Sequence, residues 1–263
     1  MPHRPTQTLA HPMDMSTPTP MLDEHHLPTD AALVQALAQD IAQRLSQAIA
    51  QRGHALLCVS GGKSPIPLFK ALASQALDWA RVSITLVDER CVPVGHPDSN
   101  TALVQQHLLQ GPAAAARFIG WIPADHSTVA APATWADRAP TLQAWANAVD
   151  AALRPLWPAD VVVLGMGMDG HTASLFSQAQ GLAQAIAPDS RSLCTAVRPP
   201  HAPHDRLTLS LNALHAARHV ALPLQGAAKR QVYELARAGA STNRPVSLVL
   251  HGTANNVAVW IAD

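Results

Sequence analysis

DVVVLGMGMDGHTASLF, residues 160–176, joins an unbroken apolar run to a turn rich in glycine and polar side chains. The run from Val161 to Leu164 is typical of a strand buried on both faces of a parallel sheet, because a half-exposed strand would alternate apolar and polar residues. The glycines that follow, at 165, 167 and 170, allow a sharp turn and a close approach of the backbone to a ligand. This segment therefore predicts a central strand whose carboxyl end carries a binding loop, with a helix beginning at Thr172.

Apolar runs of strand length recur on both sides of this segment, at 55–59, 82–87, 117–122, 207–211, 220–224 and 257–261. Helical patterns lie between most of them, at 30–51, 66–73, 100–109, 134–153 and 227–238. Continuously apolar strands that alternate with helices indicate a parallel sheet. We expect a doubly wound α/β fold, with a mostly parallel sheet, flanking helices and one irregular lobe, that forms a single domain over residues 29–263.

Residues 1–28 differ from the rest of the chain, because repeated prolines interrupt any helix and the continuous apolar segment of a signal peptide is missing. We expect a disordered or loosely ordered leader here. Nowhere in the sequence do about 18 consecutive apolar residues occur, so no membrane span is predicted.

Composition argues against several classes of partner and cofactor. The 263 residues are 48% hydrophobic and 14% charged with a formal net charge of zero, so no basic field attracts nucleic acid or anionic lipid. The cysteines, at 58, 91 and 194, form no C-x-x-C pair, and His25 and His26 are too isolated for a metal site. We therefore expect a cytoplasmic protein with no metal and no cofactor, and we favour a monomer.

Three polar clusters follow apolar strands, at 60–65, 88–100 and 165–176. Open parallel sheets bind ligands at the carboxyl ends of their strands, where such loops meet. Scattered surface residues would not all fall at these points. We therefore expect one site built from the three loops.

The first loop contains Ser60, Gly61, Gly62, Lys63 and Ser64 and leads into a helix. Backbone N–H groups at a helix start attract phosphate through hydrogen bonds and the helix dipole, and the two serines add hydroxyl donors. The alternative is a tight strand-to-helix turn with no ligand. The loop lacks the G-x-x-x-x-G-K-[ST] spacing of a nucleotide P-loop.

The second loop begins with Asp88, Glu89 and Arg90. Arg90 can stabilise an anion or a developing oxyanion, and either acid can orient a water molecule or contact a substrate hydroxyl. A structural ion pair within the loop is an equal alternative. Further along, Ser99 and Asn100 match a helix cap.

The third loop places Asp169 and His171 two residues apart at the mouth of the predicted sheet. Histidine titrates near neutral pH, so His171 can act as a general base while Asp169 orients it or binds hydroxyl groups. A lone histidine is more often structural, but a position between glycines at a strand end favours a functional role.

Four segments together resemble the signatures of the 6-phosphogluconolactonase family. They are Ser60-Gly61-Gly62, Asp88-Glu89-Arg90-Cys91-Val92-Pro93 with Asp98-Ser99-Asn100, the segment 165–176, and Arg206-Leu207-Thr208-Leu209-Ser210 with Gly226-Ala227-Ala228-Lys229. The similarity runs from about residue 30 to the C-terminus. Its most specific element is the string DGHTASLF at 169–176, whereas the Gly-Gly loop alone is common.

The resemblance implies a Rossmann-like sheet, similar to that of glucosamine-6-phosphate deaminases. It also implies hydrolysis of 6-phospho-D-glucono-1,5-lactone to 6-phospho-D-gluconate in the pentose phosphate pathway. By this similarity, the loop 60–64, Arg206 and Lys229 would hold the phosphate. His171 would be the base, supported by Asp169, and Arg90 would lie beside the reacting lactone.

Two other functions remain as alternatives. An amino-sugar-phosphate isomerase or deaminase would resemble this chain through D-G-H but would then carry a glutamate, where this sequence has Phe176, and an aromatic residue in place of Arg90. A non-enzymatic sugar-phosphate sensor would be expected to lose His171 or to carry a DNA-binding segment. The Pro-rich leader does not match a helix-turn-helix.

Overall fold

The structure, a computed structural model, describes residues 22–123, 134–252 and 257–262. Its main sheet has seven strands in the order β1-β10-β9-β6-β2-β3-β5, and every neighbouring pair is parallel. The strands are β1 (Asp23–Leu27), β2 (Ala55–Val59), β3 (Val82–Leu86), β5 (Arg117–Phe118), β6 (Val161–Val163), β9 (Val220–Gln225) and β10 (Val257–Ala262). The parallel α/β architecture predicted from the apolar runs is confirmed.

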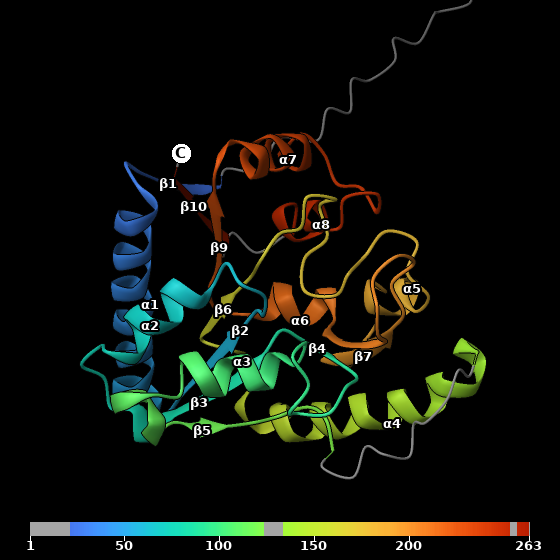
Figure 1. Cartoon of the computed structure of the whole chain (residues 1–263), viewed down its shortest axis with the longest axis horizontal. Coiled ribbons are helices and arrows are strands. Elements are labelled where there is room, and N and C mark those ends of the chain that lie inside the picture. The colour runs from blue at the N-terminus through green and yellow to red at the C-terminus, as the bar shows by residue number, and fades with distance from the viewer. Residues whose placement is uncertain (1–21, 124–133, 253–256, 263) are drawn as a thin grey trace, which may run out of the picture.

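Helices flank the sheet on both sides, as a doubly wound fold requires. Figure 1 shows α1 on one side of the sheet and α6, α7 and α8 on the other. The helices are α1 (Asp30–Arg52), α2 (Ile66–Ala73), α3 (Asn100–His107), α4 (Trp135–Leu153), α5 (Leu182–Ala185), α6 (Leu211–Ala216), α7 (Ala227–Arg237) and α8 (Val246–Leu250), with 3₁₀ turns at Trp79–Arg81, Gly111–Ala115 and Arg154–Leu156. In the part of the chain that the structure describes, no helix has the length and apolar content needed to cross a membrane.

Helix α1 illustrates how local sequence and packing agree. Thr29 caps its start, where the Thr29 hydroxyl accepts a hydrogen bond from the N–H of Ala32 at 3.1 Å. Gly53 ends it in a left-handed conformation with φ of 79°, which glycine adopts without strain. The buried stripe that includes Leu37 and Ile41 packs this helix against the sheet, where it contacts β1, β2, β6 and β10.

The order of the strands creates a topological switch point. From β2 the chain continues to β3 and β5 on one side, whereas from β6 it continues to β9 and β10 on the other. The connections on either side of the β2–β6 boundary therefore run in opposite directions. The carboxyl ends of these two strands flank a crevice, where open α/β sheets bind their ligands.

A second, antiparallel sheet of three strands was not predicted. Its order is β4-β8-β7, with β4 (Asp88–Arg90), β7 (Cys194–Val197) and β8 (Arg206–Leu209), and α4 packs against β7 and β8. The predicted strand 207–211 therefore belongs to this sheet and ends at 209. The sheet carries part of the second loop, Asp88–Arg90.

Residues 23–27 differ from the expected leader, because they form the edge strand β1 parallel to β10. Tertiary partners hold this polar segment. Glu24 accepts hydrogen bonds from Tyr233 and Arg237, and His25 stacks on Trp260 with ring centroids 4.2 Å apart. Residues 1–21 of the predicted leader lie outside the described residues.

The helix predicted to begin at Thr172 is also wrong, because residues 172–176 form a turn and helix α5 begins only at Leu182. Hydrogen bonds to neighbouring segments hold this turn. The Thr172 hydroxyl donates to the carbonyl of Gly165 at 2.7 Å, and the N–H of Ser174 donates to the hydroxyl of Thr208 at 3.1 Å.

Candidate active site

A cavity of about 220 Å³ lies at the carboxyl ends of β2, β6 and β9, beside β4. Its position matches the switch point of the sheet. Eight of the residues predicted for the site line this cavity. They are Ser60, Gly61, Gly62, Ser64, Asp88, Arg90, His171 and Lys229. Residues from all three predicted loops therefore meet around one space.

His171 and Asp169 form a hydrogen-bonded pair at this cavity. Nδ1 of His171 lies 2.5 Å from Oδ1 of Asp169, and the backbone N–H of His171 donates to the same oxygen at 3.2 Å. Partial burial raises the pKa of Asp169, but the hydrogen bond and the charge of His171 outweigh burial and lower this pKa below its usual value. Since an ionised carboxylate only accepts, Nδ1 carries the proton and Nε2 is the nitrogen able to take one from water.

The imidazole also has a fixed orientation. Phe176 stacks on the His171 ring, with centroids 4.1 Å apart and an angle of 23° between the planes. Asp169 does not line the cavity, whereas 30% of the His171 side chain is exposed, so water and substrate can reach the ring. The arrangement is that of a base supported from behind by a carboxylate.

The turn that holds this pair depends on glycine. The N–H of Gly167 donates to the carbonyl of His171 at 2.9 Å, and the N–H of Gly170 donates to the carbonyl of Gly167 at 3.0 Å. A Cβ atom on Gly167 would lie 2.2 Å from the His171 ring and 2.5 Å from Asp169 Oδ1. Gly167 therefore gives the imidazole and the carboxylate the space in which they meet.

The β2–α2 loop packs closely against Asn100. The amide of Asn100 donates to the carbonyl of Asp88 at 2.8 Å, and a Cβ atom on Gly61 would lie 1.8 Å from Asn100 Oδ1. Ser60 is buried and bonds to β6, its N–H donating to the carbonyl of Val163 at 3.0 Å. Lys63 is exposed and does not line the cavity, although it belongs to the same loop.

The two acids of the second loop have different environments. Asp88 lines the cavity and accepts a hydrogen bond from the hydroxyl of Ser174 at 2.6 Å. Glu89 is fully buried outside the wall and accepts from the backbone N–H groups of Arg90, Asn100 and Thr101 at 2.7–2.8 Å. Burial raises the pKa of Glu89 even though these donors favour its charged form. Glu89 therefore fixes the start of α3, and the structure does not bring it to the cavity.

Arg90 and Arg206 lie opposite each other on β4 and β8. Arg90 lines the cavity, and its Nη1 donates to the carbonyl of Asp98 at 2.6 Å. Arg206 is buried outside the wall and donates to the carbonyl of Pro203 at 3.1 Å. Burial lowers the pKa of Arg206, and Asp88 opposes this effect. The structure therefore does not bring Arg206 to the cavity, and the charge of Arg90 also lowers its pKa.

Lys229 lies in the first turn of α7 and reaches the cavity from the β9 side. Burial lowers the pKa of its ammonium group. Gln225, the last residue of β9, lines the cavity as well. The sequence interpretation did not single out Gln225 and took Asn100 only as a cap. The sequence signals that could have identified them are the position of Gln225 at the end of a strand and that of Asn100 in the second loop.

Comparison with known proteins supports a single family. The family model described as glucosamine-6-phosphate isomerases/6-phosphogluconolactonase matches residues 28–260. A 6-phosphogluconolactonase from Pseudomonas putida is 42% identical over 228 residues, covering 86% of this chain and 88% of that protein. One from Neisseria meningitidis is 39% identical over 239 residues, covering 91% and 98%.

Comparison with solved structures gives the same result. A crystal structure of a 6-phosphogluconolactonase from Shewanella baltica superposes with a TM-score of 0.82 at 36% identity, covering 93% of this chain and 99% of that one. A monomeric glucosamine-6-phosphate deaminase of the NagB superfamily has a TM-score of 0.68 at 17% identity, covering 92% and 97%. This second likeness supports the shared fold alone.

Proposed function

This chain belongs to the glucosamine-6-phosphate isomerase/6-phosphogluconolactonase family, and we propose that it hydrolyses 6-phospho-D-glucono-1,5-lactone to 6-phospho-D-gluconate in the pentose phosphate pathway. The observation that carries the proposal is the imidazole of His171, which faces the same cavity as Lys229 and the loop 60–64 and bonds to Asp169 through its other nitrogen. A base on one side and anion-binding groups on the other suit a phosphorylated ester.

The reaction needs a base and stabilisation of one negative charge. Water gives a proton to Nε2 of His171 as its oxygen forms a bond to C1 of the lactone. The former carbonyl oxygen then carries the charge, which Arg90 stabilises with the positive potential of Arg206 behind it. The bond from C1 to the ring oxygen breaks, and that oxygen takes the proton back from His171. Asp169 stabilises the imidazolium between the two transfers.

The phosphate of the substrate is bound at the other end of the cavity. Lys229 supplies a cation there, and Ser60, Ser64 and the N–H groups of the β2–α2 loop supply hydrogen-bond donors. Asp88 and Gln225 contact sugar hydroxyl groups. The monomeric state and the cytoplasmic location stay predictions from the sequence.

Phe176 favours lactone hydrolysis over deamination of an amino sugar. Deaminases of this family resemble the chain up to D-G-H and then use a glutamate with the histidine. Phe176 stacks on His171 instead and has no proton to relay. The ring also shields one face of the imidazole from solvent.

A direct assay tests the proposal. Freshly prepared 6-phosphogluconolactone is incubated with the purified chain, and acid release is followed in a pH-stat after spontaneous hydrolysis is subtracted. We expect rapid hydrolysis of the lactone and no ammonia from glucosamine 6-phosphate in a parallel reaction. Ammonia release with no acceleration of lactone hydrolysis would overturn the proposal and identify the chain as a deaminase.

A further inference from the structure

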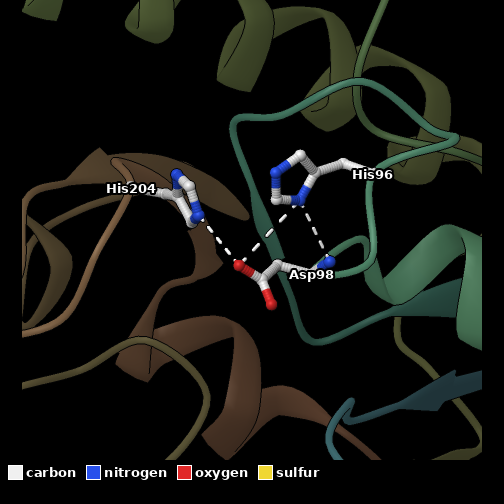
Figure 2. A group of neighbouring side chains, drawn as sticks. All are labelled: His96, Asp98 and His204. Atoms are coloured by element: carbon white, nitrogen blue, oxygen red, sulfur yellow. Dashed lines mark hydrogen bonds and ion pairs between the residues drawn. The ribbon is translucent and has the colours of Figure 1, made fainter.

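His96, Asp98 and His204 form a cluster at the surface, and none of the three lines the cavity (Figure 2). His96 and Asp98 lie between β4 and α3, whereas His204 lies between β7 and β8. Figure 2 shows both imidazoles directed toward one carboxylate oxygen of Asp98. Nε2 of His204 lies 3.0 Å from this oxygen, and Nδ1 of His96 lies 3.9 Å from it. We propose that the three side chains bind one divalent transition-metal ion such as Zn²⁺.

The spacing of the potential ligand atoms suits such an ion. Zinc binds nitrogen and oxygen at about 2.0–2.2 Å, so ligand atoms around it lie roughly 3–3.5 Å apart. The separation of 3.0 Å lies at the lower limit of this range and that of 3.9 Å lies above it, and all three atoms lie within 4.8 Å of one another. A small movement of His96 completes the geometry.

His96 uses Nδ1 in a hydrogen bond that an ion would replace. The backbone N–H of Asp98 lies 3.1 Å from Nδ1 of His96, and because this N–H can only donate, Nδ1 accepts it with its lone pair. An ion in the cluster takes over this lone pair as the His96 ring moves.

The donor set selects the class of ion. Two imidazoles and one carboxylate are typical ligands of zinc and its neighbours, whereas Mg²⁺ and Ca²⁺ prefer oxygen alone. The side chains of His96, Asp98 and His204 are 37%, 51% and 27% exposed, so an ion can enter from solvent and keep water as a further ligand.

The ion would join two loops that are far apart in the sequence. Asp98 also accepts a hydrogen bond from Nη1 of Arg90 through its backbone carbonyl, at 2.6 Å. An ion on the Asp98 carboxylate therefore fixes the loop that anchors Arg90, while it stays outside the cavity and takes no part in hydrolysis. Its expected effect is on stability.

Isothermal titration of the full, untagged chain with ZnCl₂ after dialysis against EDTA tests the site. We expect one Zn²⁺ ion per chain and a higher Tm in its presence. His96→Ala and His204→Asn should each weaken binding at least about tenfold, because even the indirect partners of metal ligands typically contribute 10- to 100-fold. Asparagine is chosen at position 204 because the backbone there has a left-handed φ of 68°.

Two controls separate this site from other histidines. His201→Asn changes an exposed histidine of the same loop and should bind Zn²⁺ as the wild type does. His171→Ala removes the candidate base and should leave this site intact. Three results would each overturn the proposal. They are absence of Zn²⁺ binding to the wild type, binding by both cluster variants as tight as that of the wild type, and loss of binding only in His171→Ala.

Discussion

The imidazole of His171 has a charged and an apolar neighbour. Asp169 holds Nδ1 through a hydrogen bond, and Phe176 covers one face of the ring. In the proposed mechanism, the carboxylate favours the protonated ring that forms during proton transfer, while the aromatic ring limits rotation. Both effects would assist a base that accepts a proton and returns it within one turnover.

His171→Ala should lower kcat for lactone hydrolysis by at least about 100-fold, because a positioned general base contributes roughly 10²–10⁴-fold. Binding of 6-phosphogluconate, measured by titration calorimetry, should change little since the phosphate groups remain. His201→Ala provides a control for histidine removal at the surface. A variant at position 171 with wild-type kcat would remove this residue from the mechanism.

Lys229→Ala should raise KM for the phosphorylated lactone by about 10- to 100-fold with a smaller change in kcat, since hydrogen bonds to charged groups contribute roughly 1.5–3 kcal/mol. Arg206→Ala should raise KM less, because Arg206 lies outside the cavity wall. Lys63→Ala is the matched control, a lysine that is exposed at the nearby β2–α2 loop. Steady-state kinetics would contradict the phosphate assignment if Lys229→Ala kept the wild-type KM.

Among the elements of the fold, the glycine turn after β6 is the one that positions the candidate catalytic pair. Gly167→Ala should reduce kcat by about 10- to 100-fold, because the new methyl group would displace the His171 ring and small misplacements of catalytic groups are costly. Tm should fall only slightly, since the turn lies at the surface. Gly95→Ala, where a Cβ atom meets nothing within 4 Å, is the control. Unchanged kcat in Gly167→Ala would show that the ring tolerates displacement.

The join between α1 and β9 contains a buried histidine that makes stability depend on pH. Burial, and after it the charge of Arg44, lower the pKa of His219 from 6.5 to about 4 against the opposing effect of Asp40. Between these values the unfolded chain binds a proton that the native chain excludes. The free energy of unfolding therefore falls as pH drops from 6.5 to about 4, by up to roughly 3 kcal/mol.

His219→Gln should remove this part of the pH dependence. Urea unfolding of wild type and variant at pH 7 and pH 4.5 gives the difference directly, and the variant should lose less stability on acidification. His54→Gln serves as a control at a histidine with no such burial. A stability difference between wild type and His219→Gln that is the same at both pH values would contradict the effect.

The switch point of the main sheet explains why residues more than 160 positions apart in the sequence share one cavity. Ser60 follows β2 and Gln225 ends β9, and β6 lies between these two strands in the sheet. The second sheet adds Arg90 from the side. The wall of the cavity is therefore built from both sheets.

The candidate base, cation and hydrogen-bond donors are all protein groups, so EDTA should leave kcat and KM of the dialysed enzyme unchanged at 25 °C. The lactone assay before and after dialysis measures this. The proposed ion on His96, Asp98 and His204 would affect Tm and leave hydrolysis unaltered. Loss of activity in EDTA with recovery on adding a divalent ion would overturn the metal-free reaction.

Local sequence was sufficient for the central strands and for the loop that each one carries. Val161–Val163 and Ala55–Val59 are apolar on both faces, and only a strand covered by helices on both sides buries such a run. It was insufficient for residues 172–176, where Thr208 accepts a hydrogen bond from the N–H of Ser174 and Asp88 accepts one from its hydroxyl. These partners come from another sheet and leave no local pattern.

Local sequence patterns were therefore enough to predict the fold class and the three loops of the site, because apolar runs and glycines act on the backbone over a few residues. Long-range packing placed Glu89 at the start of α3, buried Arg206 opposite Arg90, and brought Gln225 to the cavity wall. It also brought His204 to Asp98 across the gap between two loops. Burial and partnership of a side chain depend on residues distant in the chain, and packing of the complete molecule fixes which of them meet.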